Sequence, residues 1–325
     1  MRLAVSLVLL VVAGAAAAGP PFAWPLDCTP ERDCWIVRHV DRDPGPGVRD
    51  VACGTLTGDG HGGTDVALAD MAALARDVTV RAPAAGRVVG VRDGMPDIPI
   101  DAPAAQALDG RDCGNGVRID HGDGWVSQLC HLRRGSVRVR PGDRLAAGDA
   151  LGLVGLSGKT NFPHLHVGFE RAGVRVDPMD GAAVDPGAAC DTGGASLFAE
   201  APAYTPLPLV GVGVATEAPD DADLLRGAHR ARRLPASAPA LVLWAEAYGT
   251  RAGDRVRFTL RGPDGRAILD HGRRLEDGHA RGSYFAGRGR PAGGWPVGTY
   301  AAGIEWRRGD LTTRRRFVVE IIAGG

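Results

Sequence analysis

The stretch Asn161-Phe162-Pro163-His164-Leu165-His166 places two imidazoles two residues apart in the chain. It follows a Gly-rich loop and runs into the apolar residues Val167 and Phe169, which favours a strand. Because side chains alternate between the two faces of a strand, a His-x-His pair there directs both rings to one side. Two adjacent imidazoles are unfavourable when both are protonated, whereas one metal ligand beside one acid–base group is a compatible pair. The stretch alone is a weak signal, so the rest of the chain must support it.

Two further segments carry side chains of the same kind. In Gly60-His61-Gly62-Gly63-Thr64-Asp65 the two intervening glycines disfavour a helix, so we expect a loop that leads into a strand at Val66–Leu68. Such a loop can turn His61 and Asp65 towards one ion. In Gln128-Leu129-Cys130-His131-Leu132, His131 stands at the end of a predicted strand. Two imidazoles and a carboxylate form a common catalytic zinc set whose fourth position stays open to water.

The segment around these residues has an all-β pattern. Between 78 and 177, short runs rich in Val, Ile and Leu are separated by turn signals such as Pro141-Gly142-Asp143. A short helix is expected at Ala69–Arg76, and residues 93–113 form a long insertion without periodicity. The expected strands are Gly86–Arg92, Val117–Asp120, Trp125–Leu129, Ala150–Val154 and Leu165–Glu170.

Taken in order, the HxxxD motif at 61–65, the strand-end His131 and the His-Leu-His motif at 164–166 resemble the M23 family of zinc metallopeptidases, the lysostaphin-like or LytM-like endopeptidases. The sequence around these motifs also resembles the family, at Asn115-Gly116-Val117 between them and at Val176-Asp177-Pro178 after them. The resemblance covers about 50–180. It implies an antiparallel β catalytic domain with a zinc groove.

The resemblance also implies roles for individual residues. His61, Asp65 and His166 would bind one zinc ion, and His131 and His164 would be the unliganded catalytic pair. A bound zinc lowers the pKa of its water towards ~7, so that one histidine takes the proton while the other stabilises the oxyanion or protonates the leaving amine. The sequence does not divide these two roles between His131 and His164.

Two more positions bear on the substrate. Asn115, in the family's position, is expected to contact substrate or to support the site. Phe162 stands where the family commonly has Gly and should change the groove wall, and Leu129 replaces a frequent Tyr. Both departures leave the substrate preference open.

The N-terminal residues predict export. Arg2, the apolar core Leu3–Val12 and the small residues at 16–18 are typical of a signal peptide over 1–18. No later stretch is long and apolar enough to span a bilayer. We therefore expect a periplasmic or secreted protein.

Cysteine usage agrees with an oxidising compartment. Of the six cysteines, Cys113 and Cys130 flank a predicted hairpin, which favours a disulfide between them. The remaining four, Cys28, Cys34, Cys53 and Cys190, are candidates for stapling the N-terminal arm. A structural zinc site of four cysteines is the alternative, although no CxxC pair is present.

The C-terminal part predicts a second β domain. We expect an N-terminal arm over 19–49, the M23 domain over 50–184, a Pro- and Ala-rich linker over 185–221 and an immunoglobulin-like β-sandwich over 222–325. Residues 222–325 hold 19 basic and 10 acidic side chains, against 19 and 28 in residues 1–221. This favours contact of the basic domain with a cell-envelope polymer or a protein partner, although a GC-rich genome also enriches Arg. The expected sandwich strands are Ala240–Tyr248, Arg255–Arg261, Ala267–Asp270, Gly298–Glu305 and Arg316–Ile321.

Together these features predict an exported zinc metalloendopeptidase that hydrolyses the peptide cross-links of bacterial peptidoglycan. The alternatives are a non-hydrolytic envelope protein that binds peptidoglycan or regulates another hydrolase, and a secreted protease acting on Gly-rich proteins. An inactive scaffold is disfavoured because all five metal and catalytic positions are present. His121 beside Asp120 and Asp123 is expected to be a turn residue, and no nucleic-acid motif is visible.

Overall fold

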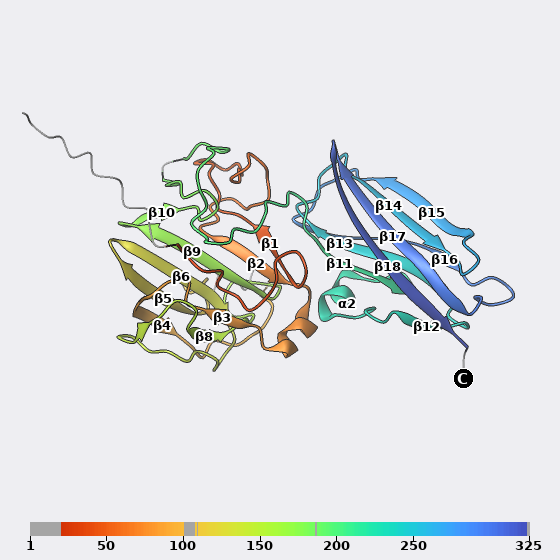
Figure 1. Cartoon of the computed structure of the whole chain (residues 1–325), viewed down its shortest axis with the longest axis horizontal. Helices are drawn as coiled ribbons and strands as arrows, with labels where there is room; N and C mark the ends of the chain where they lie inside the picture. Colours follow the sequence, from red (N-terminus) through yellow and green to blue (C-terminus); the bar gives the residue numbers. More distant parts are fainter. Residues whose placement is uncertain (1–20, 101–107, 109, 186, 324–325) are drawn as a thin grey trace, which may run out of the picture.

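The computed structural model describes residues 21–100, 108, 110–185 and 187–323. Two β domains lie side by side along the long axis of the molecule (Figure 1). The expected signal peptide lies outside the described residues. Within them, no helix has the length and apolar character needed to cross a membrane.

The N-terminal domain is built on one antiparallel sheet with the strand order β1-β2-β9-β6-β5-β4-β7 and with β10 paired to β9. A two-stranded sheet, β3 with β8, lies beside it, and both contribute to one apolar core. The strands are β1 (Cys34–Arg38), β2 (Thr64–Leu68), β3 (Thr79–Arg81), β4 (Gly86–Arg92), β5 (Asn115–Gly122), β6 (Trp125–Leu132), β7 (Arg144–Leu145), β8 (Ala150–Leu153), β9 (His164–Arg171) and β10 (Val174–Val176).

The register of β9 with its two neighbours brings the motif residues together. Asp65 of β2 lies opposite His166 of β9, and Cys130 of β6 lies opposite the same histidine. His131 follows Cys130 at the end of that pairing. Three segments that are far apart in the chain therefore meet on adjacent strands, as the sequence predicts.

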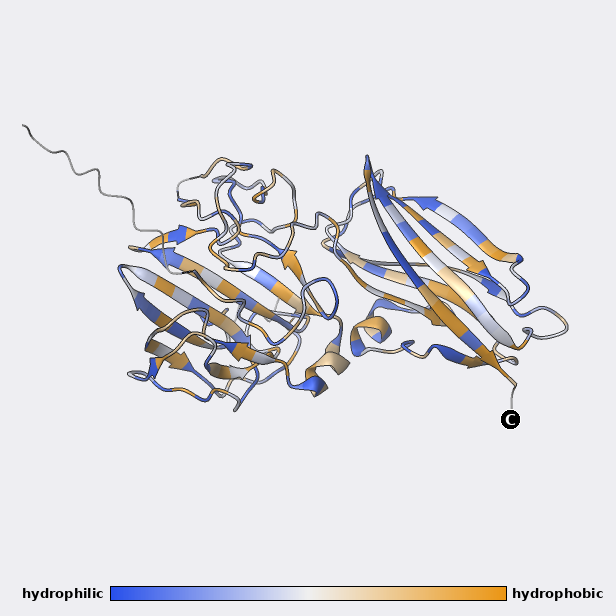
Figure 2. Cartoon of the chain, viewed as in Figure 1, coloured by the Kyte–Doolittle hydropathy of each residue, from blue (hydrophilic) through white to orange (hydrophobic). Residues whose placement is uncertain are grey.

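The C-terminal domain is a sandwich of a three-stranded sheet, β11-β13-β16, and a five-stranded sheet, β12-β18-β17-β14-β15. Inward side chains of both sheets form a second core around Trp306 and Tyr300, and Figure 2 shows the alternation of apolar and polar residues along its strands. The elements are β11 (Leu209–Ala215), α2 (Asp221–Arg226), β12 (Arg233–Pro235), β13 (Ala240–Tyr248), β14 (Arg255–Arg261), β15 (Ala267–Arg274), β16 (Arg281–Gly289), β17 (Gly298–Arg308) and β18 (Leu311–Ile322).

The sandwich begins before the expected boundary at 222. Strand β11 lies inside the predicted linker and pairs with β13. The alternating glycines of β11 are typical of a linker. In the structure, however, a Cβ at Gly213 would lie 2.4 Å from the Trp244 ring. Glycine is needed there because the indole of the neighbouring strand covers the backbone, and this requirement is invisible in the sequence.

Three other expectations differ in detail. The N-terminal arm is not separate from the M23 domain, because β1 pairs with β2 and Phe22 is fully buried in the first core. The expected helix at Ala69–Arg76 is a 3-10 helix, η1 (Met71–Arg76), that begins after the N-cap Asp70. Strand β16 was not predicted, because its run of Gly, Ser and Ala between arginines lacks an apolar pattern.

All six cysteines form disulfides. Cys113 pairs with Cys130 as predicted. Cys28 pairs with Cys34 within the arm, and Cys53 pairs with Cys190 across 137 positions of chain. None is free, which removes the four-cysteine zinc alternative.

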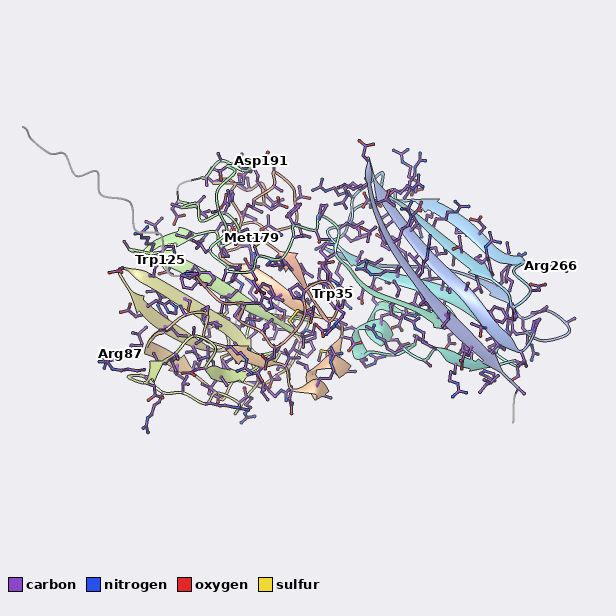
Figure 3. All side chains as sticks on the ribbon, in the orientation of Figure 1. Trp35, Arg87, Trp125, Met179, Asp191 and Arg266 are labelled. Carbon is purple, nitrogen blue, oxygen red and sulfur yellow. A yellow bond between two sulfur atoms is a disulfide. The ribbon has the colours of Figure 1, made fainter. Side chains whose placement is uncertain are left out.

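The two domains share a small apolar cluster. Trp35, Leu56 and Phe162 of the first domain pack with Val210 and Tyr248 of the second, and each is at least 94% buried. Figure 3 shows Trp35 where the two domains meet. Around this cluster, Arg230 is paired with Asp70 at 2.6 Å and Arg251 donates to Thr55 at 3.1 Å. The sandwich is therefore packed against the first domain close to the motif residues.

Candidate metal and catalytic site

Three side chains converge on one point of the first sheet. Asp65 Oδ1 lies 3.0 Å from His61 Nε2 and 2.8 Å from His166 Nδ1. One ligand atom from each of the three residues lies within 4.8 Å of the others. The loop carrying His61 reaches the strand pair because Gly63 leaves room for the His166 ring, which a Cβ would approach to 2.7 Å. This arrangement is compact enough for the three residues to share one cation.

The hydrogen bond behind His61 indicates what the site requires. His61 Nδ1 lies 2.7 Å from the carbonyl of His39, which only accepts, so Nδ1 carries the proton. In the neutral ring, Nε2 then presents a lone pair to the carboxylate oxygen of Asp65. Two acceptors at 3.0 Å need a proton or a metal ion between them. A ring held in this way by a backbone carbonyl is typical of a metal ligand.

The electrostatics of Asp65 also suit a cation. Its burial would raise its pKa, but the charge of His61 and His164 and the hydrogen bonds from His164 and His166 outweigh that effect and hold the pKa well below its usual value. Burial of His166 lowers the pKa of its ring, which favours the neutral, metal-binding form. The site therefore combines a fixed anion with an imidazole that prefers to be uncharged.

His131 and His164 lie beside this cluster, with ring centroids 4.5 Å apart. His131 Nδ1 donates to the Ser157 carbonyl at 2.7 Å. His164 Nδ1 lies 3.0 Å from the Phe162 carbonyl and 3.1 Å from Thr160 Oγ1. Each Nδ1 thus donates to a carbonyl oxygen, so Nε2 is the second nitrogen of each ring. Nε2 of His164 lies 3.5 Å from Asp65 Oδ1.

The backbone and burial of His131 set it apart from an ordinary strand residue. Its φ is 63°, in the left-handed region that side chains other than glycine rarely adopt. Burial and then the neighbouring rings of His164 and His166 lower its pKa well below the usual value. A neutral imidazole in a strained backbone position is a pattern that clusters at functional sites.

The cluster lies in a groove of about 570 Å³. Its lining includes the five motif residues together with Asp59, Gln128 and Lys159, and the Cys113–Cys130 disulfide forms part of the wall. The lining is therefore rich in polar side chains.

The two proposed substrate residues occupy different places. Asn115 is fully buried, and its amide bonds with the backbone of Met95 and Leu132, so its contacts favour the supporting role. Phe162 lines the groove but is 5% exposed, and its ring stacks on His164 at 4.3 Å and 19°. Its other side faces Tyr248 at 5.4 Å.

Two supporting residues were missed by sequence reasoning. Ser157 and Thr160 fix the orientation of His131 and His164 through the bonds described above. They precede the histidine motif in the Ser-Gly-Lys-Thr run, of which Ser157-Gly158 shares in the family resemblance without indicating this role. His121, by contrast, bonds with Ala85 and Ser127 and contacts Phe22, in the structural role that its turn predicts.

The site thus places two imidazoles and a carboxylate, a donor set that suits a metal ion, beside two further imidazoles. Residues 59–178 match the profile of peptidase family M23, and this part of the chain belongs to that family.

The chain is similar to proteins from several bacteria. The cell division protein DipM of Caulobacter vibrioides is 38% identical over 76 residues, which are 22% of this chain and 12% of DipM. The catalytic domain of the antimicrobial peptidase lysostaphin from Staphylococcus simulans is 20% identical, with 43% of this chain and 86% of that chain covered and a TM-score of 0.30. A zinc-containing peptidase from Vibrio cholerae is 22% identical over 45% of this chain and 41% of its own, with a TM-score of 0.29.

Proposed function

We propose that this chain is an exported zinc metalloendopeptidase that cleaves peptide cross-links of bacterial peptidoglycan. The observation that carries the proposal is the close approach of His61 Nε2 to Asp65 Oδ1, at 3.0 Å, with His166 beside them. Membership of the M23 family supports peptidase chemistry.

The donor set fits zinc. Two imidazole nitrogens and one carboxylate oxygen suit this ion and leave a fourth position open, which is typical of catalytic rather than structural sites. The proposed ligands are His61, Asp65 and His166. When bound there, zinc would supply Lewis-acid activation of water and of the scissile carbonyl.

The chain's own residues carry the proton transfers. Nε2 of His131 and of His164 are the free ring nitrogens, because both Nδ1 protons are committed to carbonyl oxygens. The neutral form can accept the proton of the attacking water, and the protonated form can donate to the departing amine. Ser157 and Phe162 hold the two rings in the required tautomer through their carbonyls.

A digestion experiment tests the proposal. We would incubate the mature chain with intact peptidoglycan sacculi, with and without a zinc chelator, and identify the released fragments by mass spectrometry. We expect a chelator-sensitive loss of cross-linked fragments. No release from protein with zinc confirmed bound would contradict the peptidoglycan substrate and direct the test to Gly-rich proteins.

Metal binding is tested separately with a matched pair of carboxylates. Asp65→Asn removes the anionic ligand, and we expect zinc affinity to fall by at least about tenfold. Asp59→Asn is the control, since Asp59 lines the same groove outside the ligand cluster. Equal zinc content in both variants would exclude Asp65 as a ligand.

A variant of the catalytic pair separates hydrolysis from mere binding. His131→Ala leaves the three proposed ligands in place and removes one proton-transfer group. We expect sacculi to be bound but cleaved at least about 100-fold more slowly. Cleavage at the full rate would exclude His131 from proton transfer. Biological activity in cells that survives this substitution would favour the non-hydrolytic alternative, in which the chain binds peptidoglycan or regulates another hydrolase.

A further inference from the structure

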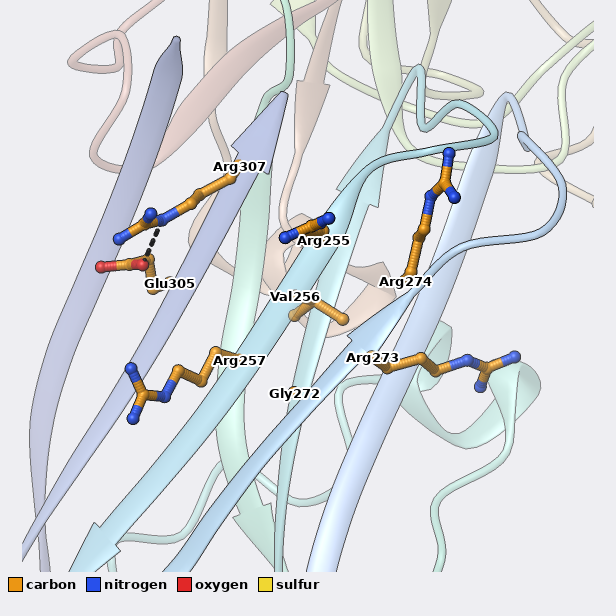
Figure 4. Close-up of a pocket in the computed structure, with 8 residues that line it drawn as sticks. All are labelled: Arg255, Val256, Arg257, Gly272, Arg273, Arg274, Glu305 and Arg307. Atoms are coloured by element: carbon orange, nitrogen blue, oxygen red, sulfur yellow. Dashed lines mark hydrogen bonds and ion pairs between the residues drawn. The ribbon is translucent and has the colours of Figure 1, made fainter. Parts of the chain in front are cut away.

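The outer face of the five-stranded sheet carries a row of opposed arginines. Arg255 of β14 lies directly opposite Arg274 of β15 and Arg307 of β17. Directly opposite residues on one face of a sheet have Cβ atoms about 4.5–5.5 Å apart, and like charges in such pairs are destabilising. Figure 4 shows the three side chains on neighbouring strands.

The acidic groups on this face do not neutralise the row. Arg257 is paired with Asp270, while Glu305 is shared between Arg307 and Arg314. Among the described residues, Arg255 and Arg274 have no carboxylate partner. Both side chains are exposed, so their donors are available to a ligand.

The row borders a hollow. Gly272 lies opposite Arg257, and a Cβ there would meet nothing within 4 Å. The space is about 390 Å³ and is bounded by Arg255, Arg274, Arg307 and the Glu305 carboxylate. A second, smaller hollow continues past Arg257 towards Arg314 and Arg316 on β18. Basic side chains therefore border two neighbouring hollows on this face.

We propose that this basic face binds the peptidoglycan polymer itself, through the free carboxylates at the ends of its peptide stems. The proposal rests on the proposed function for its choice of polymer. Guanidinium groups recognise carboxylates in bidentate geometry, and a carboxylate between Arg255 and Arg274 would remove their repulsion. A second contact on the polymer that the groove cleaves also raises the effective concentration of cross-links at the groove.

A sedimentation assay tests this face. We would pellet intact sacculi with the full mature chain in the presence of a chelator, so that hydrolysis is blocked, and compare Arg255→Gln/Arg274→Gln with the unchanged protein. We expect about tenfold weaker binding by the variant, and a loss of binding by the unchanged protein as salt rises from about 0.05 M to about 0.5 M. Sedimentation unaffected by the substitutions would overturn the proposal.

Two controls make the result specific. Arg140→Gln/Arg266→Gln removes the same charge from exposed turns, and we expect near-normal binding. Amidation of the free carboxylates of the sacculi should abolish the difference between the variants. If binding persists after amidation but disappears when phosphate-containing polymers are stripped from the sacculi, the ligand is phosphate and the peptidoglycan assignment is wrong.

A soluble substrate separates this proposal from the proposed function. Both the unchanged chain and Arg255→Gln/Arg274→Gln should cleave a soluble cross-linked muropeptide dimer at equal rates, because the basic face lies outside the groove. If neither protein cleaves the dimer, the proposed function fails. The sedimentation assay still tests whether the basic face binds peptidoglycan. The variant should also melt no lower than the unchanged chain, since it loses a repulsive pair.

Discussion

His39 shows how a single residue behind the site acts through both its backbone and its ring. Its carbonyl accepts from His61, whereas its ring is 1% exposed, and neither ring nitrogen has a partner among the described residues. Burial and the nearby charges of His61 and Arg42 lower the pKa of His39 to about 4, against the opposing effect of Asp50. The ring is therefore neutral in the folded protein at neutral pH.

This lowered pKa has a consequence for stability against pH. The unfolded chain binds the His39 proton at its ordinary pKa of 6.5, so the folded state loses stability as pH falls from 6.5 towards 4. Between pH 7 and pH 5 this group alone should remove about 2 kcal/mol from the free energy of unfolding. We expect His39→Phe, which does not titrate, to flatten that part of the curve in denaturant titrations. A curve identical to that of the unchanged protein would contradict the expectation.

At the scale of elements, the N-terminal arm is fastened to the Val-Asp-Pro turn by a buried ion cluster. Arg42 is fully buried, and its guanidinium bonds to Asp177 at 2.8 Å and to Asp180 at 2.5 Å. The same group donates to the Ala189 carbonyl. The Val-Asp-Pro motif, which in the sequence only marks the end of the family resemblance, therefore holds the N-terminal arm in place.

Removing the cation should leave two buried carboxylates without their partner. We expect Arg42→Met to lower the free energy of unfolding by about 3–5 kcal/mol in denaturant titrations. Arg32→Met serves as the control, because Arg32 is 75% exposed and its pair with Asp33 should contribute less than about 1 kcal/mol. Similar losses in both variants would show that the burial of the cluster is not what stabilises it.

The strands also show how much of the fold could be predicted from the sequence. Strands β4, β13 and β14 begin and end where their apolar alternation predicts. Strand β11 was hidden because its glycines serve the Trp244 ring of another strand. The site could also be predicted only in part. The spacing of the histidine motifs identified the five residues, whereas the carbonyls that orient their rings come close only through tertiary contacts.

At the scale of the whole molecule, the sandwich supports the proposed catalytic pair, His131 and His164. Tyr248 packs on Phe162, which in turn stacks on His164. A change on β13 is thus transmitted through one ring to a proposed catalytic imidazole. Tyr248 packs on Phe162 without lining the groove itself, so it is a positioning residue.

Truncating Tyr248 should loosen this support. We expect Tyr248→Ala to lower the free energy of unfolding by about 3–5 kcal/mol and to slow cleavage of a soluble muropeptide dimer about tenfold, with zinc content unchanged. Tyr284→Ala is the matched control, because Tyr284 is buried in the sandwich core against Trp306. It should lower stability while leaving the rate of the folded enzyme near normal, and equal rate losses in both variants would contradict a specific path through Phe162.

The ring contact between Phe162 and Tyr248 also limits how this protein can be recombined with others. An exchange of the C-terminal domain at the predicted linker would assume that the two domains are independent. Here a chimera joined within 185–221 would discard Tyr248 and the rest of β13, and would expose the back of Phe162 to solvent. A donor module would have to supply an aromatic ring at the same place, or the recipient would need a smaller residue at 162.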